Sequence, residues 1–367
     1  MMFHLIRDSL IKKSKRLFNF FLFSLVIFSS CSLENGRKPV CHVQLYTDEV
    51  VFFSSEKEIS CLKIDGNEPC GKKEISVRQT DLKNLDQPIT YKVHNVKNQV
   101  ICEGKFKIPK ESMKFAVIAD TSYGSGPLPK LVKIMVDFSP DMVFHVGDFQ
   151  YDNRRDRWSK LFEYFAPLLS NSFFYLAAGN HEYDSERDAE ILRKYFPHEG
   201  NFFFEWNGIR FWGINTFKNG WQSDFLRFVD FIGNDKPLII FIHKPFVSLS
   251  RWEELGTMNE QVLEHVHDRM SLVFSGHDHL YGRVHMVFPQ KTVQNIVTGG
   301  GGAHIYGCAK AKSRDFKIGK IPPFKAEVEK CIEEFNVTLC EIDKTKVQCR
   351  AVSSEGTEID NFSVELR

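Results

Sequence analysis

The amino-acid sequence predicts an α/β protein that is preceded by a smaller all-β domain. From about residue 115 onward, short apolar segments typical of buried strands alternate with segments typical of helices. Between residues 40 and 109, apolar and polar residues instead alternate with the period of two that half-buried strands show. The chain has 367 residues, more than one ordinary hydrophobic core needs. We therefore expect two domains.

The composition excludes one class of partner. Hydrophobic residues make up 43% and charged residues 26%, which is usual for a globular protein. The formal net charge is only +1, so the chain lacks the basic excess of a nucleic-acid-binding protein. We expect no specific nucleic-acid partner.

Residues 1–30 have the plan of a secretory signal. A positively charged stretch that ends at Arg16 is followed by the apolar run 17–28 and then by Ser29 and Ser30. A twelve-residue helix over this run would rise about 18 Å, less than the roughly 30 Å hydrocarbon core of a bilayer. The run is therefore too short to be a membrane span.

Small residues directly before Cys31 resemble a bacterial lipoprotein cleavage site, after which the cysteine carries the lipid. Phe28 departs from that pattern, because an aliphatic residue is usual there. We expect Cys31 to anchor the exported protein to a bacterial membrane, on the periplasmic face or the cell surface, with residues 31–39 as a polar tether. A simple signal peptide and an uncleaved signal anchor are the alternatives.

The nine cysteines also indicate export. Without Cys31 an even number remains, and no two of them have CxxC spacing, so a structural zinc site is not expected. Disulfides in an oxidising compartment account for them better, with free buried thiols as the alternative. We expect bridges among Cys41, Cys61, Cys70 and Cys102, whose pairing the sequence leaves open, and among Cys308, Cys331, Cys340 and Cys349.

The predicted elements follow one another in a simple order. The segment 40–109 is expected to be a small β-sandwich with a structural or docking role, because it carries no evident chemistry. The segment 110–367 is expected to be the catalytic domain. Within it we expect strands at 115–119, 142–146, 173–177, 238–242, 272–275 and 293–297, helices at 128–137, 158–169 and 261–269, and a closing hairpin at 336–352.

The closing hairpin allows two cysteines to be paired by counting. If residues 344–345 form a two-residue loop, Cys340 stands opposite Cys349. Directly opposed Cα atoms lie about 4.5–5.5 Å apart, a distance that a disulfide can bridge. We therefore expect a Cys340–Cys349 bridge, which leaves Cys308 to pair with Cys331. The loop lacks the Gly or Asn that such hairpins favour, so a longer loop with a shifted register is the alternative.

Polar side chains that bind metals follow five of the predicted strands. The carboxyl ends of parallel strands meet at one edge of a sheet, so these residues are expected to lie close together. A single Asp or His after a strand would be weak evidence, but five in this order are strong evidence. The residues are Asp120, Asp148, Asn180 with His181, His243, and His277 with His279.

The order and spacing of these motifs resemble the calcineurin-like metallophosphoesterase superfamily over roughly residues 114–355. The glycine run at 298–303 fits that order as a loop near the site, although a flexible turn is its alternative interpretation. The resemblance implies a four-layer α/β (α+β) metallophosphoesterase sandwich and hydrolysis of a phosphate ester by a hydroxide that two metals hold.

One substitution makes the sequence most similar to purple acid phosphatases. Most superfamily members have a metal-binding His two residues after the first Asp, where this chain has Ser122. Tyr151 stands three residues after Asp148, as in the Gly-Asp-x-x-Tyr motif of purple acid phosphatases, whose Tyr takes the place of the missing His. That family more often has Gly at the position of Ser122. A β-sandwich ahead of the catalytic domain also matches it.

The resemblance implies a ligand set and a pair of metals. Fe(III) is expected at the first site, where the oxygen ligands are hard, and divalent Zn, Fe or Mn at the second. The first metal would be bound by Asp120, Tyr151 and His279, the second by Asn180, His243 and His277, and Asp148 would bridge both.

The resemblance also implies the residues that contact substrate. His181 would hydrogen-bond a phosphate oxygen or protonate the leaving group, so His181 and Asp148 are the expected catalytic residues, and Asn180 would also contact substrate. Glu182 would orient a neighbour. His304, after the glycine run, is a further candidate contact, whereas Arg154 and Arg155 are expected on a solvated face rather than on a phosphate.

Three functions remain open from the sequence. A phosphomonoesterase comes first, and a phosphodiesterase or nucleotidase would use the same core. A surface protein that keeps the fold without turnover is less consistent, because every implied ligand position is filled. The natural substrate and the oligomeric state are not encoded in a readable motif.

Overall fold

The computed structural model describes residues 41–46, 49–54, 59–64, 66–72, 74–78, 87–121, 126–151, 155–196, 198–233, 235–251 and 257–366. The expected signal segment and the tether with Cys31 lie outside these residues, and so do Ser122 and Arg154. Among the helices that the structure describes, none is both long and apolar enough to cross a bilayer.

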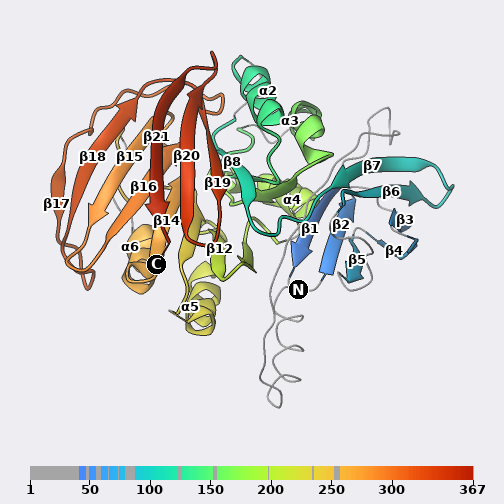
Figure 1. Ribbon diagram of the computed structural model, residues 1–367, viewed down its shortest axis with the longest axis horizontal. Coiled ribbons are helices and arrows are strands. Elements are labelled where there is room, and N and C mark those ends of the chain that lie inside the picture. Colours follow the sequence, from blue (N-terminus) through green and yellow to red (C-terminus); the bar gives the residue numbers. More distant parts are fainter. Residues whose placement is uncertain are drawn as a thin grey trace.

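Two antiparallel sheets form the N-terminal part of the fold (Figure 1). Phe52 of one sheet packs on Tyr91 of the other with ring centroids 5.3 Å apart, so the two sheets enclose a small core. The first sheet has the order β1 (Cys41–Tyr46), β2 (Glu49–Ser54), β5 (Glu74–Arg78), and the second the order β4 (Cys70–Lys72), β3 (Ile59–Ile64), β6 (Ile89–Asn95), β7 (Val100–Phe106).

A six-stranded sheet begins the second part of the fold. Its first three strands in chain order are parallel to one another, and a C-terminal hairpin adds antiparallel strands beside the first of them. The strand order is β10 (Phe173–Leu176), β9 (Met142–His145), β8 (Met113–Ile118), β19 (Asn336–Ile342), β20 (Lys346–Ser353), β21 (Glu358–Glu365).

An eight-stranded mixed sheet packs against it. Four of its strands, β12, β13, β14 and β16, run parallel. The strand order is β11 (Phe202–Trp206), β12 (Ile209–Ile214), β13 (Leu238–Ile242), β14 (Met270–Ser275), β16 (Thr292–Thr298), β15 (Tyr281–Val287), β18 (Phe324–Ile332), β17 (Arg314–Phe316).

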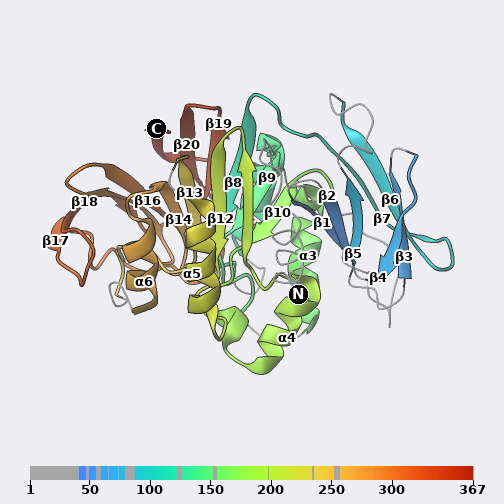
Figure 2. The same ribbon diagram turned by 90° about the horizontal axis from the view of Figure 1, so that it is seen from below.

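Helices cover the outer faces of the two sheets (Figure 2). The helices α2 (Leu128–Phe138) and α3 (Arg155–Leu169) lie on the six-stranded sheet, and α4 (Glu186–Tyr195) packs on α3 through Tyr195 and Trp158. The helices α5 (Trp221–Ile232) and α6 (Thr257–Val266) lie on the other sheet. The predicted four-layer arrangement is therefore present.

The strand β13 shows how the sequence builds these layers. All five of its residues are buried, and successive side chains point to opposite faces. Ile239 and Phe241 join the core between the two sheets, whereas Leu238, Ile240 and Ile242 join the core under α5 and α6. A continuous apolar run is what a strand covered on both faces requires.

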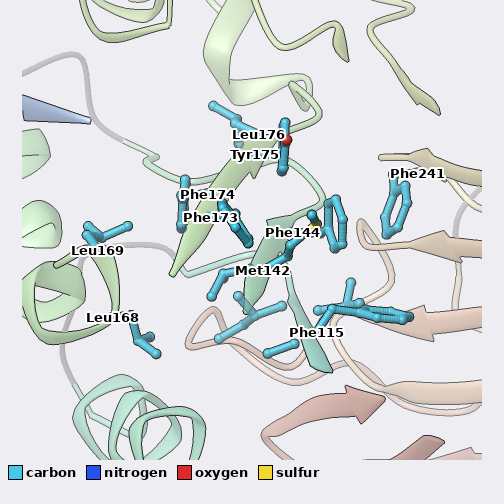
Figure 3. Packing of buried hydrophobic residues seen from close by; sticks show 14 of the residues in the cluster. Phe115, Met142, Phe144, Leu168, Leu169, Phe173, Phe174, Tyr175, Leu176 and Phe241 are labelled. Carbon is cyan, nitrogen blue, oxygen red and sulfur yellow. The ribbon is translucent and has the colours of Figure 1, made fainter. Parts of the chain in front are cut away.

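Aromatic rings fill the space between the sheets (Figure 3). Phe144 of β9 stacks on Phe241 of β13 with centroids 4.1 Å apart, and Phe115 of β8 meets Phe274 of β14 edge-on at 5.8 Å. These contacts fix the two sheets relative to each other. They thereby set the distance between the loops that leave the two sets of parallel strands.

The structure contains both C-terminal bridges that the counting predicts, Cys340–Cys349 and Cys308–Cys331. Cys340 and Cys349 are direct partners in the β19–β20 ladder. The loop needs no glycine because the carboxylate of Asp343 accepts hydrogen bonds from the backbone of Thr345 and Lys346, at 2.7 and 2.9 Å.

The structure describes three of the four N-terminal cysteines as disulfide-bonded. Cys61 bridges Cys70 across the β3–β4 ladder, where the two residues are direct partners. Cys102 is disulfide-bonded as well. The side chain of Cys41 lies outside those that the structure describes.

Replacing Cys340 and Cys349 together by Ala is expected to lower the free energy of unfolding by about 2–3 kcal/mol, the loop-closure value for a short loop. Guanidinium unfolding of the oxidised proteins measures this. Because the strand β8 stays paired with β19, turnover at the site described below should change less than the stability does. An unchanged free energy of unfolding would contradict the entropic role of the bridge.

Candidate metal centre

The structure brings every predicted metal ligand to one edge of the two sheets. Asp120 follows β8, Asp148 follows β9, Asn180 follows β10, His243 follows β13, and the pair His277 and His279 follows β14. Tyr151 joins them from the loop that Asp148 begins. The residues form two adjoining clusters.

The first cluster contains Asp120, Tyr151 and His279. The Tyr151 hydroxyl lies 3.0 Å from Oδ1 of Asp120 and 2.8 Å from Nε2 of His279. The remaining pair, His279 Nε2 and Asp120 Oδ1, is 3.3 Å apart. Asp120 is fully buried and His279 almost so. Three ligand atoms therefore form a triangle small enough to surround one ion.

The second cluster contains Asp148, His243 and His277. One ligand atom from each of them lies within 4.8 Å of the others. Nε2 of His243 is 3.3 Å from Oδ2 of Asp148 and 3.2 Å from Oδ1 of Asn180. The four residues assigned to the second site by the sequence are thus together, and Asp148 stands among them.

Hydrogen bonds to the backbone fix the two buried imidazoles of His243 and His279. Nδ1 of His243 lies 2.8 Å from the carbonyl oxygen of Val146, and Nδ1 of His279 lies 2.8 Å from that of His304. A carbonyl oxygen only accepts, so each Nδ1 carries a proton, and each Nε2 faces the carboxylate oxygens as the atom that takes up either a second proton or a metal ion.

Buried carboxylates beside these nitrogens attract a cation to them, either a proton or a metal ion. Burial lowers the pKa of His243, but the charge of Asp148 and its hydrogen bond outweigh burial and raise the pKa to about 9. The pKa of His279 is raised in the same way, with burial opposed by Asp120. Protons are thus drawn to the positions that metal ions would take. The residues present fit a pair of metal ions.

Two further pKa shifts follow from the same charges. Burial and then the positive charge of His243 lower the pKa of His277 to about 2, so its imidazole is neutral and can bind a metal. Burial and the negative charge of Asp120 raise the pKa of Tyr151 far above its usual value. The phenol of Tyr151 therefore keeps its proton, and its hydroxyl donates a hydrogen bond to Asp120.

Three of the ligands have unusual backbone conformations. Asp120, Asp148 and His277 have φ values of 59°, 51° and 65°, in the left-handed region that residues other than Gly seldom adopt. Gly147 lets the loops approach one another, because a Cβ there would lie 2.5 Å from Nδ1 of His243 and 2.7 Å from the amide nitrogen of Gly179. The surrounding fold holds these turns in place.

Glu182 holds two of the ligand loops together. Its buried carboxylate accepts hydrogen bonds from the backbone N–H groups of Asp148, Phe149 and Gly179, at 2.9, 2.8 and 2.7 Å. Burial and then the charge of Asp148 raise the pKa of Glu182 to about 8, and the N–H groups oppose that rise. Both carboxylate oxygens act as acceptors, so the ionised form is the one that fits.

His181 lies at the open side of the second cluster. Its Nδ1 contacts the carboxylate of Asp184, its Nε2 is 3.7 Å from Oδ2 of Asp148, and the side chain is 30% exposed. The rings of His181 and Tyr151 lie 4.0 Å apart. The imidazole edge that can donate a proton therefore faces the centre, while Asp184 holds the other edge.

Several supporting residues were not predicted from the sequence. Asp278, between the two metal-binding histidines, accepts hydrogen bonds from Ser248, Leu249 and Ser250, at distances down to 2.6 Å, and so ties that loop to the centre. The ring of Tyr306 stacks on His279. Of these two residues, only Asp278 could have been found from the sequence, because it is a carboxylate that lies inside the last ligand motif, between His277 and His279.

The glycine run packs against the centre. Gly301 donates a hydrogen bond to the carbonyl of Ala119 at 3.0 Å, and a Cβ on Gly301 would lie 2.1 Å from that oxygen. The run is thus a close-packed loop beside Asp120, not a free turn. The His304 side chain that follows it is exposed, and the residue reaches the centre through its carbonyl oxygen.

Comparisons with known proteins agree with this geometry. Residues 113–281 match the family model of the calcineurin-like phosphoesterases. Curated proteins give no significant match. The fold is similar to a purple acid phosphatase from yellow lupin (Lupinus luteus) seeds, with 14% identity and a TM-score of 0.68 over 91% of this chain and 80% of that one.

Two further solved structures share the fold at low identity. PhoD has 10% identity and a TM-score of 0.57 over 96% of this chain and 93% of that one. GAP50, the anchor in the inner membrane complex of Plasmodium, has 14% identity and a TM-score of 0.54 over 70% of this chain and 90% of that one. At these identities the likenesses show the fold alone.

Replacing Glu182 by Gln should weaken metal binding about 10–100-fold, the usual cost of losing a residue that positions ligands. The Gln amide group would place N–H donors against backbone N–H donors and would disturb the backbone of Asp148. Metal titration followed by calorimetry measures the change.

The matched control is Glu205→Gln, because Glu205 on β11 is also buried but forms ion pairs with Arg210 of β12 and with Lys236, which precedes β13. The circular dichroism spectra of both variants should match that of the unchanged protein, which would show that the fold is kept. Equal metal affinities for Glu182→Gln and the unchanged protein would show that Glu182 does not position the ligands.

Proposed function

Residues 113–281 are a calcineurin-like metallophosphoesterase domain, and from this premise we propose that the chain hydrolyses phosphate monoesters at a pair of metal ions. The observation that carries the proposal is the convergence of two complete ligand clusters at one sheet edge. Each cluster offers three or more potential ligand atoms, which lie within 3.3 Å of one another in the first cluster and, for Asp148, His243 and His277, within 4.8 Å in the second. A surface protein without turnover would not need this arrangement.

Asp120, Tyr151 and His279 would hold the first metal. Carboxylate and phenolate oxygens are hard ligands and favour Fe(III) there. The second metal would be bound by Asn180, His243 and His277, whose amide and imidazole groups suit divalent Zn, Fe or Mn, with Asp148 between the two sites. When bound, such a metal pair activates a water molecule and neutralises charge on both oxygens of an in-line displacement.

His181 would act on the phosphate or the leaving group. The contact of its Nδ1 with Asp184 fixes the ring, so Nε2 can donate to an oxygen bound in the centre. At 30% exposure the side chain is within reach of a substrate that enters from solvent. Proton donation to the leaving group is worth about 10²–10⁴-fold in rate.

The buried ligands would be shielded from solvent by the loops themselves. Asp120, Asp148 and His243 are each at most 1% exposed, while Asn180, His181 and His277 are partly exposed. The substrate would therefore approach on the side of His181 and His277. Low exposure of the remaining ligands strengthens their attraction for cations, because less water competes.

An aryl phosphate should be turned over by the metal-loaded protein faster than a bis-aryl phosphate, and chelation should abolish both activities. Restoring iron and zinc should restore turnover. His181→Asn in the same assay should lower kcat by about 10²–10⁴-fold without changing the metal content.

Two results bear against this account. Faster turnover of the bis-aryl phosphate would favour a phosphodiesterase, and no turnover of either ester with both metals bound would favour a surface protein that keeps the fold. A His181→Asn variant with unchanged kcat would show that the proton comes from elsewhere.

Tyr151→Phe should bleach the colour that a tyrosinate bound to Fe(III) gives through charge transfer. The variant lacks the oxygen that would bind iron, and its first site should also lose iron more readily during dialysis. Visible absorption of the oxidised protein measures the change, with Tyr183→Phe as the control because that phenol bonds Asn215 instead. A coloured Tyr151→Phe protein would show that another residue binds the iron.

A further inference from the structure

The loop 299–313, which joins β16 to β17, supports one of the expected metal ligands. Nδ1 of His279 lies 2.8 Å from the carbonyl oxygen of His304. The ring of Tyr306 lies nearly parallel to the His279 ring, with centroids 4.0 Å apart, and the backbone N–H of Tyr306 donates to the carbonyl oxygen of His279 at 2.9 Å. Residues 304–306 therefore hold both the imidazole and the backbone of His279.

This loop depends on anchors to keep one conformation. The structure describes all of its residues, and none of them belongs to a helix or a strand. Its first part is fixed by hydrogen bonds such as that from the N–H of Ala303 to the carbonyl oxygen of Asp120, at 2.9 Å. Beyond residue 306, Cys308 forms a disulfide with Cys331 of β18, and its N–H donates to Oε1 of Glu333 at 2.8 Å. Residues 304–306 thus lie between a hydrogen-bonded anchor and a covalent one.

The disulfide leads back to the same ligand. Cys331 stands directly opposite Gly282 in the β15–β18 ladder. Gly282 lies near the start of β15 and follows His279 closely in the sequence. The disulfide therefore closes a ring of contacts that leads from His279 along the chain to β15, across the ladder to Cys331, and through Cys308 back to the residues that contact the imidazole.

The other C-terminal disulfide has no such place. Cys340 and Cys349 are direct partners in the β19–β20 ladder, so their bridge joins two strands that are already paired. Cys340 also stands opposite Phe115, near the beginning of β8, whereas Asp120 follows the end of that strand. The bridge between Cys340 and Cys349 thus strengthens a sheet, whereas the other fixes a loop that supports a ligand.

We propose that the Cys308–Cys331 bridge positions the metal centre by keeping residues 304–306 against His279, which then faces the first metal. This inference rests on the proposed function, from which it takes the metal pair. Without the bridge the loop would gain conformational freedom, and the imidazole would be less well oriented before metal binds. The loss of a group that orients a ligand weakens a metal site about 10–100-fold. The first metal should be affected because His279 is its ligand.

Chelator competition on protein loaded with iron and zinc tests the proposal. Cys308 and Cys331 are both replaced by Ala, and the iron and zinc that stay bound are measured after equilibrium dialysis against rising concentrations of EDTA. The double variant should release its iron at about 10–100-fold lower EDTA concentration than the unchanged protein, and its zinc at nearly the same concentration. The visible absorption of the iron–tyrosinate centre should fall together with the iron.

The matched control is the double replacement of Cys340 and Cys349 by Ala, which also removes one bridge and is also expected to lower the stability of the fold. This variant should release both metals at the same EDTA concentrations as the unchanged protein. Equal iron release from the two double variants would overturn the proposal, because the Cys308–Cys331 bridge would then serve the stability of the fold and not the ligand.

Tyr306→Ala decides the question if the double variant of Cys308 and Cys331 does not fold. It keeps the bridge but removes the ring that stacks on His279, through which the bridge acts. Iron should again leave at lower EDTA concentration than in the unchanged protein, while zinc should not. Iron release that matches the unchanged protein would overturn the proposal.

Turnover separates this inference from the proposed function. If iron release differs as expected but neither the aryl phosphate nor the bis-aryl phosphate is hydrolysed, the proposed function fails and the role of the bridge stands. Hydrolysis of the aryl phosphate together with equal iron release from the two double variants gives the reverse result. A protein that retains no iron even without EDTA would overturn both.

Discussion

The arrangement depends on one electrostatic constraint, that buried carboxylate oxygens and imidazole nitrogens converge within a few ångströms of one another. Nε2 of His243 faces oxygens of Asp148 and Asn180 at 3.3 and 3.2 Å, and the first cluster repeats the pattern. Buried carboxylates are costly unless they are paired with cations, either protons or metal ions. The site is therefore stable with cations in it, which is the physical reason to consider it a metal centre.

The rest of the fold holds that convergence in place. Asp120, Asp148 and His277 keep left-handed backbone conformations, and Glu182 binds the backbone of two ligand loops at once. The stacked Phe144 and Phe241 fix the distance between the two sheets from which those loops come. Local strain at a site persists where such surroundings determine it.

Many of the strands and metal-binding residues could be predicted from the sequence, because the end of a strand is a local feature of the chain. An apolar run followed by Asp120 or by His243 identifies both the strand and the ligand, and the Cys340–Cys349 pairing followed from counting through one hairpin. The same count through a two-residue loop at residues 65–66 would have paired Cys61 with Cys70. Contacts between distant loops could not be predicted, since nothing in the sequence near His279 points to Tyr306, whose ring stacks on it. Strands such as β18 were also missed, because buried and exposed residues do not alternate regularly along them.

Anomalous X-ray scattering from crystals of the metal-loaded protein, measured at the iron and zinc edges, would locate the metal ions themselves. We expect two peaks about 3.5–4 Å apart, one among Asp120, Tyr151 and His279 and the other among Asn180, His243 and His277. A single peak, or peaks away from these residues, would contradict this expectation.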